Sequence, residues 1–303
     1  MYKLIAIDLD GTLLNSNGMV SNETKETLRE IINKGIKVVL TSGRMIDSIR
    51  TIAEEIGEQK YLIAGNGSIV YDIENHQILY TNFLSKEKVL DVIKICEENS
   101  IYYNIYTESE VLTPALKYNV LYYHKENANR EEKDRTKINL VDNMYEYIQN
   151  SDREDFLKMT ICDEDKMIFN SIIRRLKQIK EVDVLDVEHM SRKNITKGTE
   201  TIEINYSYTE VSAKNVDKWE AIKYILEREN IAKEEVIAIG DNINDKKMIE
   251  NSGLGIVMKG STPVVTEIAD IVTEESNDSD GVAKALKKVI TQAWNITKIL
   301  QIN

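Results

Sequence analysis

Cysteine and long apolar runs are both scarce in this 303-residue chain. The two cysteines, Cys96 and Cys162, show no CxxC or Cys/His spacing, which argues against a disulfide framework or a zinc site and favours small core residues. No apolar run approaches the roughly 20 residues that span a bilayer. Asp8 and Asp10 interrupt the N-terminus where a signal peptide would stay apolar. We therefore expect a soluble, cytoplasmic protein with no membrane partner.

Basic residues are also in the minority, with 39 Lys and Arg against 51 Asp and Glu, a net charge of −12. Nucleic-acid binding depends on basic surfaces that neutralise phosphates, so we expect no nucleic-acid partner. An anionic substrate would have to meet positive charge locally, from a metal or a few Lys and Arg side chains. The 42% hydrophobic content is sufficient for one large core or two modest ones.

Short β-type runs alternate with helical patterns at both ends of the chain. Helices are expected near Asn22–Lys34 and Met45–Ile56, and again near Asp217–Glu229 and Asn244–Glu250, with apolar strands between them. Apolar runs buried on both faces are typical of a parallel sheet covered by helices. The sequence thus predicts an α/β protein with a Rossmann-like parallel sheet core to which both ends contribute.

The middle of the chain has a different pattern, which we interpret as an inserted α/β domain. Its Tyr-rich segments, IYYNIY from Ile101 and YNVLYYH from Tyr118, are typical of half-buried strands. The charged segment 125–137 mixes both signs, which favours a solvated loop or helix face. No repeat, Pro-rich segment or Gly/Ser linker marks the boundaries. We place them so that residues 1–83 and 209–303 form the core and residues 84–208 form the insert.

The most informative segment is IAIDLDGTLL, from Ile5 to Leu14. Residues two apart in a strand face the same side, so Asp8 and Asp10 should converge at the strand's carboxyl end, where open α/β sheets bind ligands. Such close carboxylates repel unless a cation lies between them, and hard oxygen ligands favour Mg²⁺. Asp8 could then attack phosphorus while Asp10 acts as acid and base. An ordinary Asp-Gly turn is the alternative.

A second strand, VVLTSGR from Val38, ends in Ser42, Gly43 and Arg44. Gly43 would let the main chain approach an anion, and Ser42 could donate to a phosphoryl oxygen. Lys218, at the start of a helix, could offset the repulsion between Asp8 and phosphate, although an exposed first-turn lysine is the simpler interpretation of that residue alone.

A third strand, VIAIGDNIND, ends in a cluster of acids and amides. Asp241 is placed to complete a carboxylate shell around the metal. Asn244 or Asp245 could support that shell by contacting the ligands without binding the metal directly. Asn242 or Asn244 could also cap the next helix.

Together, DLDGTL, TSGR, Lys218 and GDNIND resemble, in order and strand context, the four motifs of the haloacid dehalogenase superfamily. GNGSIVY from Gly65 and ADIVTEESNDSDGVAKAL from Ala269 resemble its Cof-type, sugar-phosphatase-like members. The resemblance implies that the insert is a large α/β cap of type IIB, in which substrate choice would reside.

The resemblance also implies roles for individual residues. Asp8 would be the nucleophile, Asp10 the acid and base with its main-chain carbonyl on Mg²⁺, and Asp241 a further ligand. The predicted catalytic positions are Asp8, Asp10, Ser42 and Lys218. The predicted metal ligands are Asp8, Asp10, Asp241 and Asp245. The predicted substrate-binding positions are Leu9, Ser42, Gly43, Arg44, Lys218 and Asn244.

The sequence departs from the family pattern in three places. Trp219 follows the lysine where Gly is usual, Lys259-Gly260-Ser261 replaces a common Gly-Asn-Ala, and Thr266 stands where Lys is frequent. These departures affect loop shape and substrate contacts rather than the central chemistry.

The expected function is a Mg²⁺-dependent phosphatase that hydrolyses a small phosphorylated metabolite through an aspartyl-phosphate. A sugar phosphomutase of the same superfamily is the nearest alternative, in which Asp10 would return the phosphoryl group to a sugar. A receiver-like signalling module also clusters Asp, Ser or Thr and Lys around Mg²⁺, but its single small domain does not account for the insert. A non-catalytic phospho-ligand binder is the remaining alternative.

Overall fold

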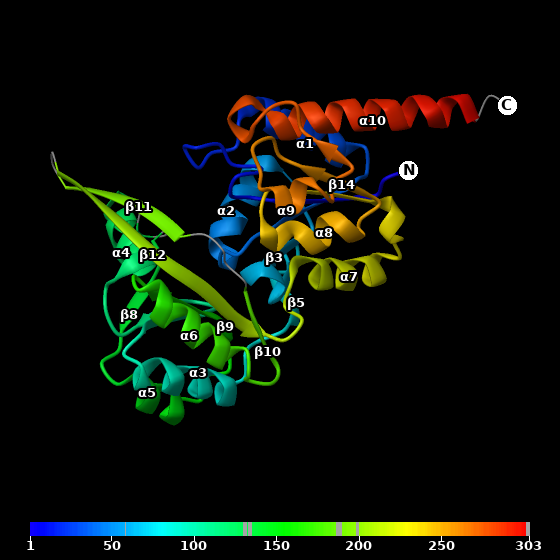
Figure 1. The fold of residues 1–303 in the computed structure, drawn as a ribbon. Coiled ribbons are helices and arrows are strands. Elements are labelled where there is room, and N and C mark those ends of the chain that lie inside the picture. The colour runs from blue at the N-terminus through cyan, green and yellow to red at the C-terminus, as the bar shows by residue number, and fades with distance from the viewer. Residues whose placement is uncertain (58, 130–131, 133–134, 186–189, 198–199, 301–303) are drawn as a thin grey trace. The chain divides into compact units, whose positions relative to one another are not determined.

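The chain forms two compact units in a computed structural model that describes residues 1–57, 59–129, 132, 135–185, 190–197 and 200–300 (Figure 1). Met1–Thr81 and Asp217–Asn303 form the first, called here the core unit. Asn82–Val216 forms the second, the insert unit.

The two boundaries differ from the predicted ones in opposite directions along the sequence. The insert unit begins at Asn82 rather than Leu84 and ends at Val216 rather than Tyr208. The difference at the second boundary has a structural reason: Tyr208 lies inside a strand that continues to Ala213. The turn that follows leads to Asp217, which caps the next helix.

A sheet in the order β15-β14-β13-β1-β2-β3-β4-β5 forms the centre of the core unit. Its pairings are parallel from β15 to β3, as predicted, and antiparallel from β3 through β4 to β5. The strands are β1 (Leu4–Asp8), β2 (Lys37–Thr41), β3 (Tyr61–Ala64), β4 (Ile69–Asp72), β5 (Gln77–Thr81), β13 (Val236–Gly240), β14 (Leu254–Val257) and β15 (Ile271–Val272).

Helices cover both faces of this sheet, which explains why β1 is buried along its whole length. Figure 1 shows α1 and α10 on one side and α7 and α8 on the other. The helices are α1 (Asn22–Asn33), α2 (Ile46–Ile56), α7 (Lys218–Glu229), α8 (Lys246–Asn251), α9 (Pro263–Thr266) and α10 (Gly281–Leu300). The unexpected Trp219 is buried in the core on the α7 side, together with Ile222 and Ala238.

Local sequence explains where α1 forms. Ser21 precedes it in an extended conformation and accepts a hydrogen bond from the Thr24 amide at 3.1 Å. Its buried residues, which include Thr24, Leu28 and Ile31, recur at the three- and four-residue spacing of one helix face. The helix therefore buries one stripe and exposes its charged positions.

The insert unit contains a second sheet, in the order β10-β12-β9-β6-β7-β8, with β11 paired to β12. Helices α3, α5 and α6 contribute to a core with β6, β9 and β12. The strands are β6 (Tyr102–Thr107), β7 (Val111–Thr113), β8 (Ile138–Leu140), β9 (Phe156–Asp163), β10 (Val182–Val184), β11 (Met190–Lys197) and β12 (Glu200–Ala213). The helices are α3 (Lys86–Glu98), α4 (Tyr118–Glu126), α5 (Met144–Asn150) and α6 (Lys166–Leu176).

One Tyr-rich segment has a different structure from the predicted strand. Ile101 leads into β6, but the segment from Tyr118 forms helix α4. Tyr118 packs edge-on against Tyr102, with ring centroids 5.2 Å apart, and Asn119 accepts a hydrogen bond from Asn104 at 3.0 Å. Tyr123 lies four residues after Asn119, so a helix presents both to the same sheet.

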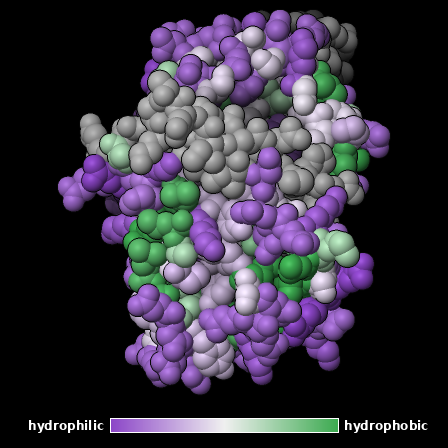
Figure 2. All heavy atoms as spheres, turned by 60° about the vertical axis from the view of Figure 1, so that its left-hand side comes forward, coloured by the Kyte–Doolittle hydropathy of each residue, from purple (hydrophilic) through white to green (hydrophobic). Residues whose placement is uncertain are grey.

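The two cysteines are fully buried, which confirms the prediction that they are core residues. The charged segment 125–137 lies partly outside the described residues. Within the part of the chain that the structure describes, no helix is both long and apolar enough to cross a bilayer. Among the residues that Figure 2 colours, hydrophilic ones predominate, and the apolar ones form separate groups.

Candidate active site

The carboxyl ends of β1, β2 and β13 lie at one edge of the core sheet. Asp8 is the last residue of β1 and pairs in register with Thr41, directly before Ser42. On the other side, Ile7 pairs with Ile239, two residues before Asp241. The parallel pairing of three strands therefore brings together loops that are far apart in the sequence.

Lys218 lies at the centre of this edge and is fully buried. It is the first residue of α7, which Asp217 caps by accepting a hydrogen bond from the Glu220 amide at 2.9 Å. The Lys218 ammonium donates to Asp8 Oδ1 and, at 2.6 Å, to Asp245 Oδ1. The structure thus differs from the exposed first-turn lysine that the sequence left open.

Burial and charge act together on this cluster. Burial alone would lower the pKa of Lys218, but the charges of Asp245 and Asp8 outweigh it and raise the pKa. Burial raises the pKa of Asp8 well above its ordinary value, and the Asp245 charge raises it further, against the opposing effect of Lys218. Without further positive charge, the site thus disfavours the ionised form of Asp8.

Asp245 is fully buried and is surrounded by donors. Besides accepting from Lys218 through Oδ1, it accepts through Oδ2 from the amides of Asp241 and Asn242, at 3.0 and 3.1 Å. A Cβ on Gly240 would lie 2.5 Å from the Asp245 side chain, so this position requires glycine. Asp245 therefore fixes the shape of the loop that carries Asp241.

Asp241 faces β1 from the end of β13. Its Oδ1 accepts a hydrogen bond from the buried Thr12 hydroxyl at 2.8 Å. Gly11, with φ +87°, makes room for this approach, because a Cβ there would overlap the Asp241 carboxylate. Burial, followed by the charge of Asp245, raises the pKa of Asp241 to about 6.

The donor set fits a hard divalent cation. Asp8, Asp241 and Asp245 each offer a carboxylate oxygen, and these oxygens lie within 4.8 Å of one another. Among the described residues, Lys218 is the cation in contact with these carboxylates, so ionising all three would leave an excess of negative charge in a largely buried cluster. A divalent cation with oxygen ligands would neutralise that excess.

Asp10 does not point into this cluster in the structure. Its carboxylate accepts two hydrogen bonds from the Arg44 guanidinium, at 2.8 Å from Nε and 2.5 Å from Nη2. The Asp10 side chain is 60% exposed and that of Arg44 32% exposed. The residue predicted as acid and base is therefore paired with a residue predicted to bind substrate.

The remaining predicted substrate-binding residues lie around the same edge. Ser42 is buried, and its hydroxyl accepts a hydrogen bond from the Arg44 amide at 3.2 Å. Leu9 is buried, and its carbonyl accepts from the Leu14 amide at 2.9 Å. Asn244 donates through Nδ2 to Asn66 Oδ1 at 3.1 Å. Gly43 also lies beside Asn66, since a Cβ on Gly43 would be 3.0 Å from the same Oδ1.

Sequence reasoning missed three participants. Thr12 and Gly11 lie within the DLDGTL motif and contact Asp241, and Asn66 connects Gly43 to Asn244. All three residues lie in segments that resemble the family, DLDGTL and GNGSIVY. The resemblance suggested no role for Asn66, the asparagine of GNGSIVY.

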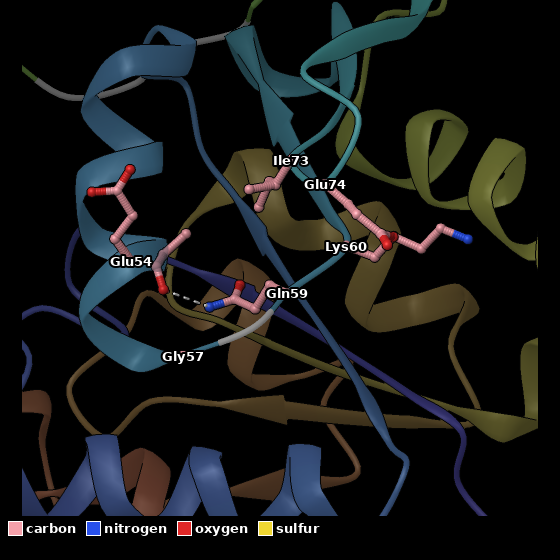
Figure 3. A pocket seen from close by; sticks show the side chains of 7 residues that line it. Glu54, Gly57, Gln59, Lys60, Ile73 and Glu74 are labelled. Carbon is pink, nitrogen blue, oxygen red and sulfur yellow. Dashed lines mark hydrogen bonds between the residues drawn. The ribbon is translucent and has the colours of Figure 1, made fainter.

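A cavity of about 710 Å³ lies elsewhere in the core unit. In Figure 3, Glu54 projects from α2, Gln59 and Lys60 directly precede β3, and Ile73 and Glu74 follow β4. Because β3 runs parallel to β2 and β1, its start is at the edge opposite the carboxylates. This cavity is therefore separate from the candidate active site.

Comparison with known proteins agrees with the motifs. The family model of haloacid dehalogenase-like hydrolases matches residues 5–286. Phosphatase YwpJ of Bacillus subtilis strain 168 is 30% identical over 297 residues, covering 95% of this chain and all of that protein. From the same organism, 5-amino-6-(5-phospho-D-ribitylamino)uracil phosphatase YcsE is 30% identical over 285 residues, covering 94% of each.

A solved structure extends the agreement to the fold. A haloacid dehalogenase-like hydrolase from Bacteroides thetaiotaomicron aligns with a TM-score of 0.75 at 28% identity, over 95% of this chain and the whole of that one. The family match covers nearly the full chain, and the similar proteins from Bacillus subtilis are named phosphatases. The chain is therefore an enzyme that belongs to the haloacid dehalogenase-like hydrolases.

Proposed function

We propose that this enzyme is a Mg²⁺-dependent phosphatase that hydrolyses a small phosphorylated metabolite through an aspartyl-phosphate on Asp8. One observation carries the proposal. Asp8, at the carboxyl end of the central strand, shares a buried cluster with Lys218 and two further carboxylates. A nucleophile, a cation and candidate metal ligands are the components that phosphoryl transfer requires.

Asp8 and Asp241 are the proposed carboxylate ligands of Mg²⁺, and the resemblance adds the main-chain carbonyl of Asp10. When bound, the ion would favour ionised carboxylates and offset the charge of the phosphoryl group. Asp245 belongs to the same carboxylate group, but both of its oxygens already accept hydrogen bonds from Lys218 or from loop amides. We therefore assign Asp245 a supporting role that holds Lys218 and the Asp241 loop in place.

In the first half-reaction, an Asp8 oxygen attacks phosphorus and forms a new P–O bond while the ester P–O bond breaks. The leaving oxygen takes a proton from Asp10. This role requires Asp10 to part from Arg44. Because the Asp10 side chain is 60% exposed, water can take the place of Arg44 as its hydrogen-bond partner when the pair opens.

In the second half-reaction, water attacks the phosphorus of the aspartyl-phosphate. Asp10 accepts the proton of that water, the Asp8 O–P bond breaks, and inorganic phosphate leaves. Lys218, already in contact with Asp8, stabilises the negative charge that develops on the transferring group. Ser42, Gly43 and Asn244 are the proposed contacts for the phosphoryl oxygens, and Arg44 becomes available to them when its pair with Asp10 opens.

The proposed substrate is a small phosphorylated metabolite, such as a sugar phosphate. The net charge of −12 disfavours polyanionic partners such as nucleic acid. Since the similar YcsE protein is named for a phosphorylated ribitylaminouracil, that compound belongs in any substrate panel.

The test is phosphate release from p-nitrophenyl phosphate and a panel of sugar, nucleotide and ribitylaminouracil phosphates, with Mg²⁺ or with EDTA. We expect release that EDTA abolishes and that Asp8→Asn lowers by about 10³-fold or more. Asp47→Asn, at an exposed first-turn position of α2, serves as the matched control and should retain wild-type rates.

Two outcomes would contradict the proposal. Isomerised sugar phosphate with little free phosphate would identify a phosphomutase instead. No turnover of any compound by a folded protein that binds Mg²⁺ would favour a phospho-ligand binder.

A further inference from the structure

The turn between β3 and β4, Gly65–Gly67, touches several of the loops that form the candidate site. We propose that its central residue, Asn66, is a positioning residue that holds the Asn244 amide and the Ser42–Gly43 loop in register for phosphoryl binding. This inference depends on the proposed function, which makes Ser42, Gly43 and Asn244 phosphoryl contacts.

Main-chain hydrogen bonds tie this turn to the loop after β2. The Asn66 amide donates to the Ser42 carbonyl at 2.9 Å, and the Gly65 amide donates to the Arg44 carbonyl at 3.0 Å. Asn66 itself has φ 57° and ψ 27°, in the left-handed region. This conformation turns the chain so that the side chain, as well as the amide, faces the neighbouring loops.

The Asn66 side chain makes the second connection. Its Oδ1 accepts the hydrogen bond from Asn244 Nδ2 at 3.1 Å. The same carboxamide lies against Gly43, where a Cβ would be 3.0 to 3.2 Å from three of its atoms. An amide that donates one hydrogen to a fixed acceptor loses its freedom to rotate, so Asn66 fixes the direction of the second Asn244 N–H.

Gly67 supplies the third connection, to the start of α7. With φ +106°, its backbone lies so close to the Asp217 carbonyl that a Cβ would overlap it, and that Cβ would be 3.1 Å from the Lys218 nitrogen. The turn is therefore packed between the Ser42 loop, Asn244 and the helix that carries Lys218. Movement of Asn66 would be transmitted to groups on two sides of the phosphoryl site.

A purely conformational role for Asn66 makes a different prediction. Asn is tolerated at positive φ, and Gly adopts the same conformation without a steric penalty. If only the backbone mattered, Asn66→Gly would be neutral. If the carboxamide matters, this variant loses the Asn244 contact while keeping the turn.

The experiment compares wild type, Asn66→Gly, Asn244→Ala and the double variant, each with excess Mg²⁺. Inorganic phosphate binding is measured by calorimetry, and KM and kcat are measured on the best substrate. We expect Asn66→Gly to weaken phosphate binding and raise KM by roughly three- to tenfold, as loss of one hydrogen bond would. The double variant should bind no more weakly than Asn244→Ala alone, because Asn66 acts through Asn244.

Asn230→Gly is the matched control. Asn230 is also left-handed, with φ 52°, and ends α7 at the opposite end from Lys218. It should leave phosphate affinity unchanged, and the melting temperatures of both glycine variants should stay close to that of wild type. If Asn66→Gly unfolds, Asn66→Ala removes the same carboxamide and should weaken phosphate binding by a similar factor. Asn244→Ala should weaken it at least as much, because it also removes the proposed phosphoryl contact.

Phosphate affinity of Asn66→Gly within twofold of wild type, or additive losses in the double variant, would overturn the proposal. Absence of phosphate binding by wild type would overturn it as well. Failure of the proposed function is distinguishable: wild type would release no phosphate from any compound while still binding phosphate, and an Asn66→Gly defect in that binding would support the positioning role.

Discussion

At the scale of single residues, the charge balance around Asp8 dominates the candidate site. Lys218 contacts Asp8 and Asp245, and Asp241 completes the group of carboxylates. Burial and the Asp245 charge raise the pKa values of Asp8 and Asp241. A carboxylate nucleophile must be ionised to attack phosphorus. The proposed mechanism therefore requires additional positive charge at this site.

Thr12 provides a test of how Asp241 is held. Replacing Thr12 by Val keeps the buried volume but removes the hydrogen bond to Asp241 Oδ1, which helps to keep the pKa of Asp241 down. Loss of such a supporting contact lowers metal affinity by about 10- to 100-fold. We expect a tenfold or greater rise in the Mg²⁺ concentration that gives half-maximal activity, measured by Mg²⁺ titration.

The control for that experiment is Thr27→Val. Thr27 is equally buried, but its hydroxyl donates at 2.7 Å to the Glu23 carbonyl within α1. Thr27→Val should leave the Mg²⁺ requirement unchanged. An unchanged requirement in Thr12→Val would contradict the inference that this hydrogen bond supports a metal-binding Asp241.

Glu229 makes acid sensitivity testable away from the active site. Burial would raise its pKa, but hydrogen bonds from Tyr61, Lys60 and Lys37 outweigh burial and lower the pKa to about 2. A lowered pKa stabilises the fold fully above the ordinary value of 4.5, and this stabilisation is lost as the pH falls from 4.5 toward 2. We expect wild type to exceed Glu229→Gln in free energy of unfolding by roughly 1–3 kcal/mol at pH 7.

Urea unfolding between pH 3 and pH 7 measures this difference. It should shrink below pH 4.5, because unfolded Glu229 then binds a proton that the folded protein does not bind until the pH approaches 2. The control is Glu250→Gln, at an exposed position of α8, which should stay close to wild type in stability at pH 7. A difference that is constant with pH would contradict the assignment.

At the scale of elements, the Gly65–Gly67 turn packs closely against α7. Alanine should therefore destabilise the protein more at Gly67 than at Gly35. Gly67 and Gly35 both have positive φ, but only Gly67 lies against another chain segment, while nothing lies within 4 Å of a Cβ at Gly35. Gly35→Ala should lower the free energy of unfolding by about 1–2 kcal/mol through backbone strain alone. Gly67→Ala should lower it by about 3 kcal/mol or more, because steric overlap is added.

Urea denaturation of the two variants side by side checks this prediction. Equal losses of stability would mean that α7 can move away from the turn without penalty. The start of α7, and with it Lys218, would then be less rigidly placed than the structure indicates.

The elements differ in how well sequence predicts them. Helix α1 could be predicted closely because its cap and buried stripe are local features. Helix α4 could not, because its Tyr residues satisfy both a strand-like composition and a helical spacing, and the choice depends on partners such as Tyr102 and Asn104 in β6. Local pattern decides an element only where tertiary contacts agree with it.

At the scale of the whole molecule, some features of the candidate site and of the domain boundaries could be predicted from sequence, and others depend on tertiary contacts. The strand-end acids could be predicted because parallel strands place their carboxyl ends at one edge. The Asn66–Asn244 contact could not, since it joins residues 178 positions apart through a turn with no metal ligand or nucleophile. The second boundary was misplaced because β12 continues to Ala213 as a single strand, and composition does not change at Tyr208.

The most direct test of the central claim is to trap the aspartyl-phosphate. Wild type and Asp8→Asn would be mixed with a turned-over substrate and Mg²⁺, quenched in acid within milliseconds, and reduced with borohydride, which converts an acyl phosphate to an alcohol. We predict homoserine at position 8 in the wild-type peptide, and no such product with EDTA or in Asp8→Asn. Rapid phosphate release with an unmodified Asp8 peptide at every quench time would contradict the proposed nucleophile.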